Sequence, residues 1–324
     1  MNHFFLASNS PKGFFSKMEF FDKELPEGWK CNVIKGGPGC GKSTYMKKVA
    51  SEIEDMGFDV EYIHCPSDPF SLDAIISHDL KTCYVDGTAP HVIDPVYPGI
   101  SGKIINLGET RKVNKLSKDK IYDLDLKSKE LRNQSQKYLI AFRSILSNSI
   151  EKKIKTIEVD FLNKVSREIL KKVPKKSFPK KCKKTVRMIS SMGPEGLLFF
   201  NQNFENTKYL YEIQDDLNLA SDIIMRKILD KLEGHNVIIC LNPISFNEKI
   251  EALIFPELSF AIFAKNRWQI FSDSEEYKSK KIKVKSKLIY DDIYVLDLLM
   301  EKSKKCLKDC YDLHCDIEKA FYLE

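Results

Sequence analysis

Eight consecutive residues near the start of the chain combine glycines, a lysine and a serine in a spacing that suits phosphate binding. They fit the pattern G-x-x-x-x-G-K-[ST] at every fixed position. The glycines leave backbone N–H groups open to an anion, while Lys42 supplies a cation for the β- and γ-phosphates and Ser43 a hydroxyl for Mg²⁺. We therefore predict a nucleoside triphosphate site made by Gly36, Gly37, Pro38, Gly39, Cys40, Gly41, Lys42, Ser43 and the following Thr44.

An acid and a histidine further along the chain are candidates to complete this site. Asp86 ends the apolar run 82–86, and a carboxylate at the end of a core strand can hold Mg²⁺ together with Ser43. The alternative is a turn residue before Gly87. His91 is a candidate to position the γ-phosphate or the attacking water, or else an exposed side chain. The predicted catalytic residues are thus Lys42, Asp86 and His91, with Ser43 and Asp86 as metal ligands.

These residues need strands and helices in a particular order to meet. The pattern predicts strands over 31–34, 58–64 and 82–86, a helix over 43–56 and a brief helix over 70–76. Strands that alternate with helices favour parallel pairing. We expect an α/β fold, a P-loop NTPase-like parallel sheet flanked by helices, with residues 1–110 as the nucleotide-binding core.

Composition narrows the class of protein. The chain has 324 residues, of which 43% are hydrophobic, so two packed domains are the starting expectation. Nine cysteines, an odd number in a large chain, favour reduced thiols and a cytoplasmic location. No apolar run reaches membrane-spanning length, and the first residues lack the pattern of a secretion signal, so we expect no membrane association.

Charge is distributed unevenly along the chain. The net charge is −5 over residues 1–110, +16 over 111–187 and −5 over 188–324. The basic segment could bind nucleic acid or an acidic protein partner, but it has few aromatic residues for base stacking, which favours a solvated helical hairpin. Residues 122–173 contain no glycine or proline and predict two antiparallel helices. A lysine-rich tract with two prolines then predicts a linker, so 111–184 form the second segment.

The remaining residues, 185–324, resemble the first part of the chain. Similar short stretches recur in the same order, about 172 to 183 residues apart. This predicts two tandem repeats, each followed by a helical hairpin. In the second copy Ser221 stands opposite Lys42 and Ala264 opposite Asp86, and 215–220 lack the glycines. We expect this copy to keep the fold without the nucleotide chemistry.

Four motifs together resemble a bacterial family of tandem-repeat P-loop ATP-binding proteins. They are Ser10-Pro11-Lys12-Gly13, the loop Lys35 to Thr44, the strand end His64-Cys65-Pro66-Ser67-Asp68-Pro69, and Asp86-Gly87-Thr88-Ala89-Pro90-His91. The resemblance implies a P-loop fold that binds ATP and Mg²⁺. Similar family members often carry a second Gly-Lys-Ser loop, from which this sequence departs over 215–222.

The leading functional hypothesis is a hydrolase that cleaves MgATP at a single site in the first half. A small-molecule kinase would use the same groups and pass the phosphate to a hydroxyl. Two further hypotheses are a non-catalytic nucleotide sensor and a nucleic-acid-associated protein that binds through the basic segment.

Overall fold

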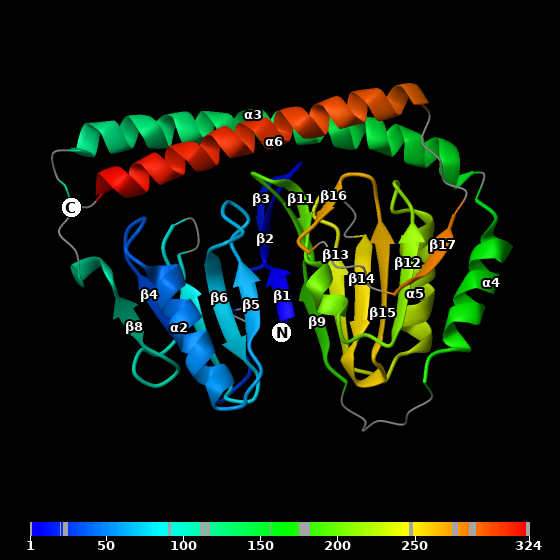
Figure 1. Ribbon diagram of the computed structural model, residues 1–324, viewed down its shortest axis with the longest axis horizontal. Coiled ribbons are helices and arrows are strands. Elements are labelled where there is room, and N and C mark those ends of the chain that lie inside the picture. The colour runs from blue at the N-terminus through cyan, green and yellow to red at the C-terminus, as the bar shows by residue number, and fades with distance from the viewer. Residues whose placement is uncertain are drawn as a thin grey trace.

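In the computed structural model, the described residues are 2–19, 21, 25–89, 92–110, 114, 117–155, 157–174, 182–245, 249–273, 278–284 and 290–321. Two bodies of sheet and helix lie side by side, and two long helices run across the top of both (Figure 1). The chain is therefore a mixed α/β protein, as expected at that level.

The first body is built on a six-stranded sheet in the order β1-β5-β6-β7-β4-β8. Its strands are β1 Asn2–Phe5, β4 Lys30–Lys35, β5 Glu61–His64, β6 Leu72–Ser77, β7 Thr82–Asp86 and β8 Ile104–Asn106. Helix α2, Lys42–Asp55, follows β4 and packs on β6. Its buried residues, Met46, Ala50 and Ile53, recur at helical spacing, so one face of α2 is covered by the sheet.

The second body is built on a six-stranded sheet in the order β17-β12-β15-β14-β13-β9. Its strands are β9 Lys184–Arg187, β12 Tyr209–Gln214, β13 Val237–Leu241, β14 Ile250–Phe255, β15 Phe260–Lys265 and β17 Lys280–Lys283. Helix α5, Ala220–Lys231, packs on β14 and β15, and α4, Val159–Leu170, packs on α5. The apolar residues of these two helices and of the sheet form one buried cluster.

Strand for strand, the two sheets have the same order and the same directions. In each, the strand that precedes the loop and helix lies between two parallel neighbours, β7 and β8 in one and β15 and β17 in the other. Further from it come two antiparallel pairs and a final parallel pair. Smaller elements complete the chain: β2 Ala7–Ser10, β3 Gly13–Ser16, β10 Ser190–Gly193, β11 Gly196–Phe199, β16 Gln269–Phe271, and 3-10 helices Gly108–Thr110, Asn201–Phe204 and Pro256–Leu258.

Two expectations about the first sheet were wrong. Residues 70–76 do not form a helix, because 72–77 form the central strand β6, and all six of its residues are buried. A strand buried on both faces lacks the alternation that would separate it from a helix in the sequence. The sheet is also mixed rather than parallel, since only residues 78–81 join β6 to β7 and so short a connection gives an antiparallel pair.

The expected helical hairpins do not form either. Helix α3 is a single helix of 37 residues, Lys118–Ile154, and α6 is a single helix of 32 residues, Tyr290–Phe321. These two helices pack against each other along their length, whereas α4 packs on α5 (Figure 1). The lysine-rich tract 175–181 lies outside the described residues.

A shared core joins the two bodies. Phe4, Phe5 and Val33 from the first half belong to the same buried cluster as Met188 and Phe263 from the second. Phe5 and Met188 also exchange two backbone hydrogen bonds, with N···O distances of 2.8 and 3.0 Å. The halves therefore form one packed unit beneath α3 and α6.

Candidate functional site

The predicted phosphate loop, residues 36–43, connects the end of β4 to the start of α2. Strand β4 lies between β7 and β8, so the loop leaves the carboxyl edge of the sheet at an interior strand. Gly39 and Gly41 have φ angles of 71° and 92°, a region that residues with a Cβ adopt only with strain. The backbone conformation of the loop therefore favours glycine at these two positions.

Lys42 lies between the loop and Asp86. Its Nζ donates hydrogen bonds to the carbonyl oxygens of Gly36 and Gly37, at 2.9 and 3.1 Å. It also lies 3.5 Å from Asp86 Oδ2, and both side chains are largely buried. Asp86 Oδ1 accepts hydrogen bonds from the backbone N–H of Thr88, at 2.9 Å, and from the Thr88 hydroxyl. The two residues predicted from separate parts of the sequence are thus brought together.

Ser43, the predicted metal ligand, faces strand β6. Its Oγ accepts a hydrogen bond from the backbone N–H of Leu72, at 3.0 Å. Thr44 is exposed, and Cys40 is buried with its thiol directed at Gly36, where a Cβ would lie 2.4 Å from Cys40 Sγ. Cys40 thus packs the loop from inside. His91, predicted as a catalytic residue, lies outside the described residues.

A second carboxyl group beside the loop was not predicted. Asp73 follows Leu72 on β6 and is only 7% exposed. Burial, together with the nearby charge of Asp86, raises the pKa of Asp73 to about 7, although Cys65 and Lys42 act in the opposite direction. Asp73 could have been found from two similar stretches, one in each half, that both carry an acid at the second position. They are Leu-Asp-Ala-Ile-Ile-Ser at 72–77 and Ile-Glu-Ala-Leu-Ile-Phe at 250–255. Expecting a helix over 70–76 concealed it.

The donor atoms of this region suit a divalent cation. Within the described ranges, no cluster of three or more His, Cys, Asp or Glu side chains is arranged to hold a metal alone. However, Mg²⁺ beside a triphosphate needs only one or two protein oxygens, since phosphate and water supply the others. Ser43 and Asp86 fit that requirement, and the effect of Asp86 on the pKa of Asp73 indicates an excess of negative charge that a cation would relieve.

In the second half, the loop that corresponds to residues 36–43 binds a carboxylate that belongs to the loop itself. The loop after β12 contains Asp215, which is 1% exposed. Its carboxylate accepts hydrogen bonds from the backbone N–H groups of Leu217, Leu219 and Ser221, at 2.8 to 3.2 Å, and from the Ser221 hydroxyl. The backbone donors that could bind a phosphate are therefore directed at a buried side chain.

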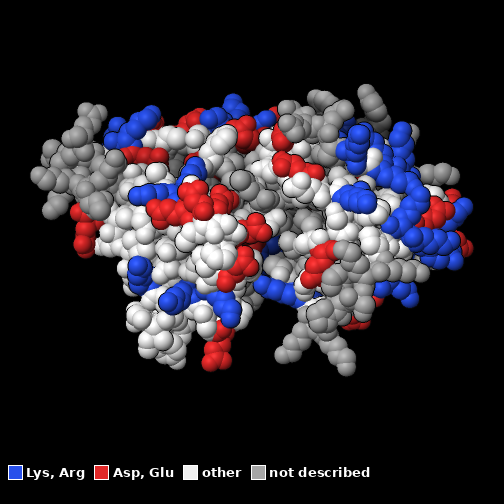
Figure 2. Space-filling model, turned by 60° about the horizontal axis from the view of Figure 1, so that its bottom comes forward, with Lys and Arg blue, Asp and Glu red and all other residues white. Residues whose placement is uncertain are grey.

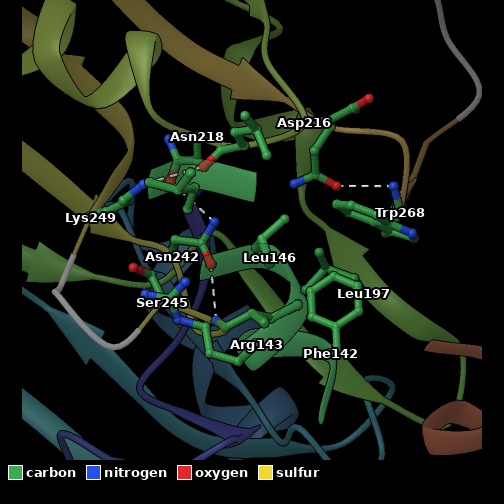
Figure 3. A pocket seen from close by; sticks show the side chains of 14 residues that line it. Phe142, Arg143, Leu146, Leu197, Asp216, Asn218, Asn242, Ser245, Lys249 and Trp268 are labelled. Carbon is green, nitrogen blue, oxygen red and sulfur yellow. Dashed lines mark hydrogen bonds between the residues drawn. The ribbon is translucent and has the colours of Figure 1, made fainter. Parts of the chain in front are cut away.

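A pocket lies beside that second loop, under α3 (Figure 3). Its walls include Phe142 and Arg143 from α3 and Lys249, the residue before β14. Arg143 and Lys249 are both almost fully buried. Burial lowers the pKa of Lys249 to about 8, while the charges of Asp215 and Asp222 partly oppose that shift. The pocket thus has buried cations beside it, but the loop N–H groups on this side are directed at Asp215.

A basic surface lies over the second half of the chain. Figure 2 shows Lys and Arg side chains gathered over the second half, at the right of that view. Strand β17, which belongs to this half, carries exposed Lys280, Lys281 and Lys283. Among the described residues, no helix has both the length and the apolar character needed to cross a bilayer.

Comparisons with protein-family models, with curated proteins and with solved structures give no match for this chain. Its function is therefore inferred from the site itself.

Proposed function

We propose that this chain is a P-loop nucleoside triphosphatase that hydrolyses MgATP at one site in its first half. The observation that carries the proposal is the position of Lys42, held between the carbonyl oxygens of the loop and the carboxylate of Asp86. This is the arrangement in which a lysine can move to the β- and γ-phosphates while the acid remains beside the metal. The glycine loop and the start of α2 add backbone donors for the phosphates.

In this proposal each group has a distinct task. Loop N–H groups and Lys42 bind the phosphates and stabilise the negative charge that develops as water attacks the γ-phosphorus. Ser43 and Asp86 hold Mg²⁺, which neutralises phosphate charge when bound. Thr88 keeps the Asp86 carboxylate oriented through its two hydrogen bonds. The bond from the γ-phosphorus to its bridging oxygen breaks, and ADP and phosphate are released.

We further propose that the two halves are tandem copies of a P-loop fold, of which only the first keeps the nucleotide chemistry. The shared strand order and directions of the two sheets support this. So does the carboxylate of Asp215, which takes the backbone donors of the second loop. All nine cysteines lie among the described residues and are free, which supports a reducing environment.

Calorimetric titration with ATP, with and without Mg²⁺, combined with a phosphate-release assay, tests the proposed function. Lys42→Ala should weaken triphosphate binding roughly 100-fold, because it removes the charged donor to the phosphates. Lys48→Ala is the matched control, since Lys48 lies on the same helix and its side chain is 78% exposed. Phosphate release without an acceptor supports the ATPase. Turnover only with an added metabolite would favour the kinase, and the absence of nucleotide binding would contradict the proposal.

A further inference from the structure

The carboxyl end of α6 lies directly on the phosphate loop. Figure 1 shows this end of the helix above α2 and β4. The side chain of Glu318 lies against Gly39, where a Cβ would be 3.3 Å from Glu318 Cβ, and the backbone N–H of Gly39 interacts with the Glu318 carboxylate. The ring of Phe321 lies against Gly37, where a Cβ would be only 2.4 Å from the ring atom Cε1. Gly37 is therefore required for this close approach.

Glu318 uses the groups that a phosphate would use. A hydrogen bond from His314 lowers the pKa of Glu318, burial opposes this, and the N–H of Gly39 and the charge of Lys42 lower it further. The carboxylate is consequently ionised near neutral pH. An anion already bound to a loop N–H group, close to the lysine, competes with any phosphate oxygen that approaches the same donor.

The second half shows a related arrangement with one important difference. There the competing carboxylate, Asp215, belongs to the loop itself and is 1% exposed. In the first half the carboxylate comes from the last turn of a distant helix, and Glu318 is 41% exposed. A buried carboxylate within its own loop has no route of exit, whereas Glu318 can leave when the end of α6 moves.

We propose that the carboxyl end of α6, residues 314–321, is an autoinhibitory plug that a nucleotide must displace from the phosphate loop. This inference rests on the proposed function and adds its regulation. A triphosphate exchanges the contact between Glu318 and Gly39 for its own, and it lifts Phe321 from Gly37.

Changing Glu318 tests the plug. Glu318→Gln removes the competing charge, and Glu318→Ala removes the contact. Both should bind MgATP and inorganic pyrophosphate about tenfold more tightly than the unchanged chain, since a hydrogen bond to a charged group no longer has to be broken. Asp316→Asn is the control, because Asp316 is on the same turn but pairs with Lys319. Equal or weaker binding by the Glu318 variants would overturn the plug.

Hydrogen exchange without nucleotide provides a second measurement. Glu318→Ala should speed exchange of the Gly39 amide, whereas Asp316→Asn should leave it unchanged, and an unaltered Gly39 rate in Glu318→Ala would count against the plug. The two proposals fail differently. If nucleotide binds and Lys42→Ala weakens that binding as expected, but the Glu318 variants do not bind more tightly, only the plug is wrong. If no form of the chain binds nucleotide, the proposed function is wrong and the plug falls with it.

Discussion

At the residue scale, the two halves keep an acid at the same buried position and differ in what surrounds it. Asp73 on β6 and Glu251 on β14 are the second residues of matching strands. Burial raises the pKa of each to about 7. Asp73 lies near Lys42 and Asp86, whereas Glu251 accepts hydrogen bonds from Ser190 and Gln269. The acid thus persists where the counterparts of Lys42 and Asp86 are missing, which indicates a packing role common to both sheets.

Glu251 should make the stability of the chain depend on pH. Its pKa is raised from 4.5 to about 7 in the folded state, so the unfolded chain ionises first as pH rises. The stabilisation is present below pH 4.5 and is lost as pH rises through 7, by up to about 3 kcal/mol. Glu251→Gln keeps an acceptor for Gln269 and offers a donor to Ser190. We therefore expect Glu251→Gln to change the free energy of unfolding more favourably at pH 8 than at pH 5.

Urea unfolding at both pH values measures this difference. Glu233→Gln is the control, since Glu233 is 78% exposed and its replacement should have the same small effect at either pH. A Glu251→Gln variant whose effect does not change between pH 5 and pH 8 would show that Glu251 is not held neutral by burial.

At the element scale, the sequence predicted local elements well and their distant partners poorly. The strand at 82–86 is confirmed at the same bounds, and 31–34 and 43–56 are confirmed within one residue as parts of β4 and α2. Apolar runs and apolar residues at helical spacing carried that information. The pairing of α3 with α6 had no local signal, because the contacts join residues more than a hundred positions apart. The contact of Glu318 with the loop was unpredictable for the same reason.

The seam between α3 and α6 combines apolar packing with buried hydroxyl groups. Leu139 of α3 and Leu296 of α6 are fully buried in one cluster. Further along, the hydroxyl groups of Ser135 and Ser303 hydrogen bond to each other at 2.8 Å. The small serine side chains let the two helices approach closely, and the leucines provide the buried apolar contact. The long helices are therefore held by each other rather than by a local hairpin.

Leu296→Ala should destabilise the chain by about 2 to 5 kcal/mol, because it leaves a cavity in this seam. Leu298→Ala is the matched control on the same helix, since Leu298 is 44% exposed and its loss should cost less than about 0.5 kcal/mol. Chemical denaturation followed by circular dichroism measures both. Equal effects of the two substitutions would mean that α6 does not use this face to pack on α3.

At the scale of the whole molecule, a buried ion pair ties the two sheets together. Glu61 on β5 and Arg187 on β9 form two contacts, Nε with Oε1 and Nη2 with Oε2, the second at 3.2 Å. Their side chains are 6% and 2% exposed. Burial alone would raise the pKa of Glu61, but the charge of Arg187 and hydrogen bonds from His78 and Arg187 lower it to about 2. The pair is thus ionised, and each charge depends on the other half of the chain.

Removing Arg187 should show how strongly the stability of the chain depends on the ion pair with Glu61. Arg187→Met leaves the Glu61 carboxylate buried without its cation, and we expect a loss of about 3 to 5 kcal/mol in the free energy of unfolding. Adding Glu61→Gln removes the stranded charge, so the double variant should recover part of the loss. Urea unfolding of the single and double variants, followed by probes in each half, provides the measurement.

The pH dependence of the same variants separates an ion pair from simple packing. Because the pKa of Glu61 is lowered from 4.5 to about 2, its stabilisation is present above pH 4.5 and is lost as pH falls through 2. The difference in the free energy of unfolding between the unchanged chain and the double variant should therefore become smaller below pH 4.5. If this difference does not change with pH, the loss of stability in the variants comes from packing and not from the ion pair. If Arg187→Met costs less than about 1 kcal/mol and both halves still unfold together, the shared core around Phe5 and Met188, rather than the ion pair, couples them.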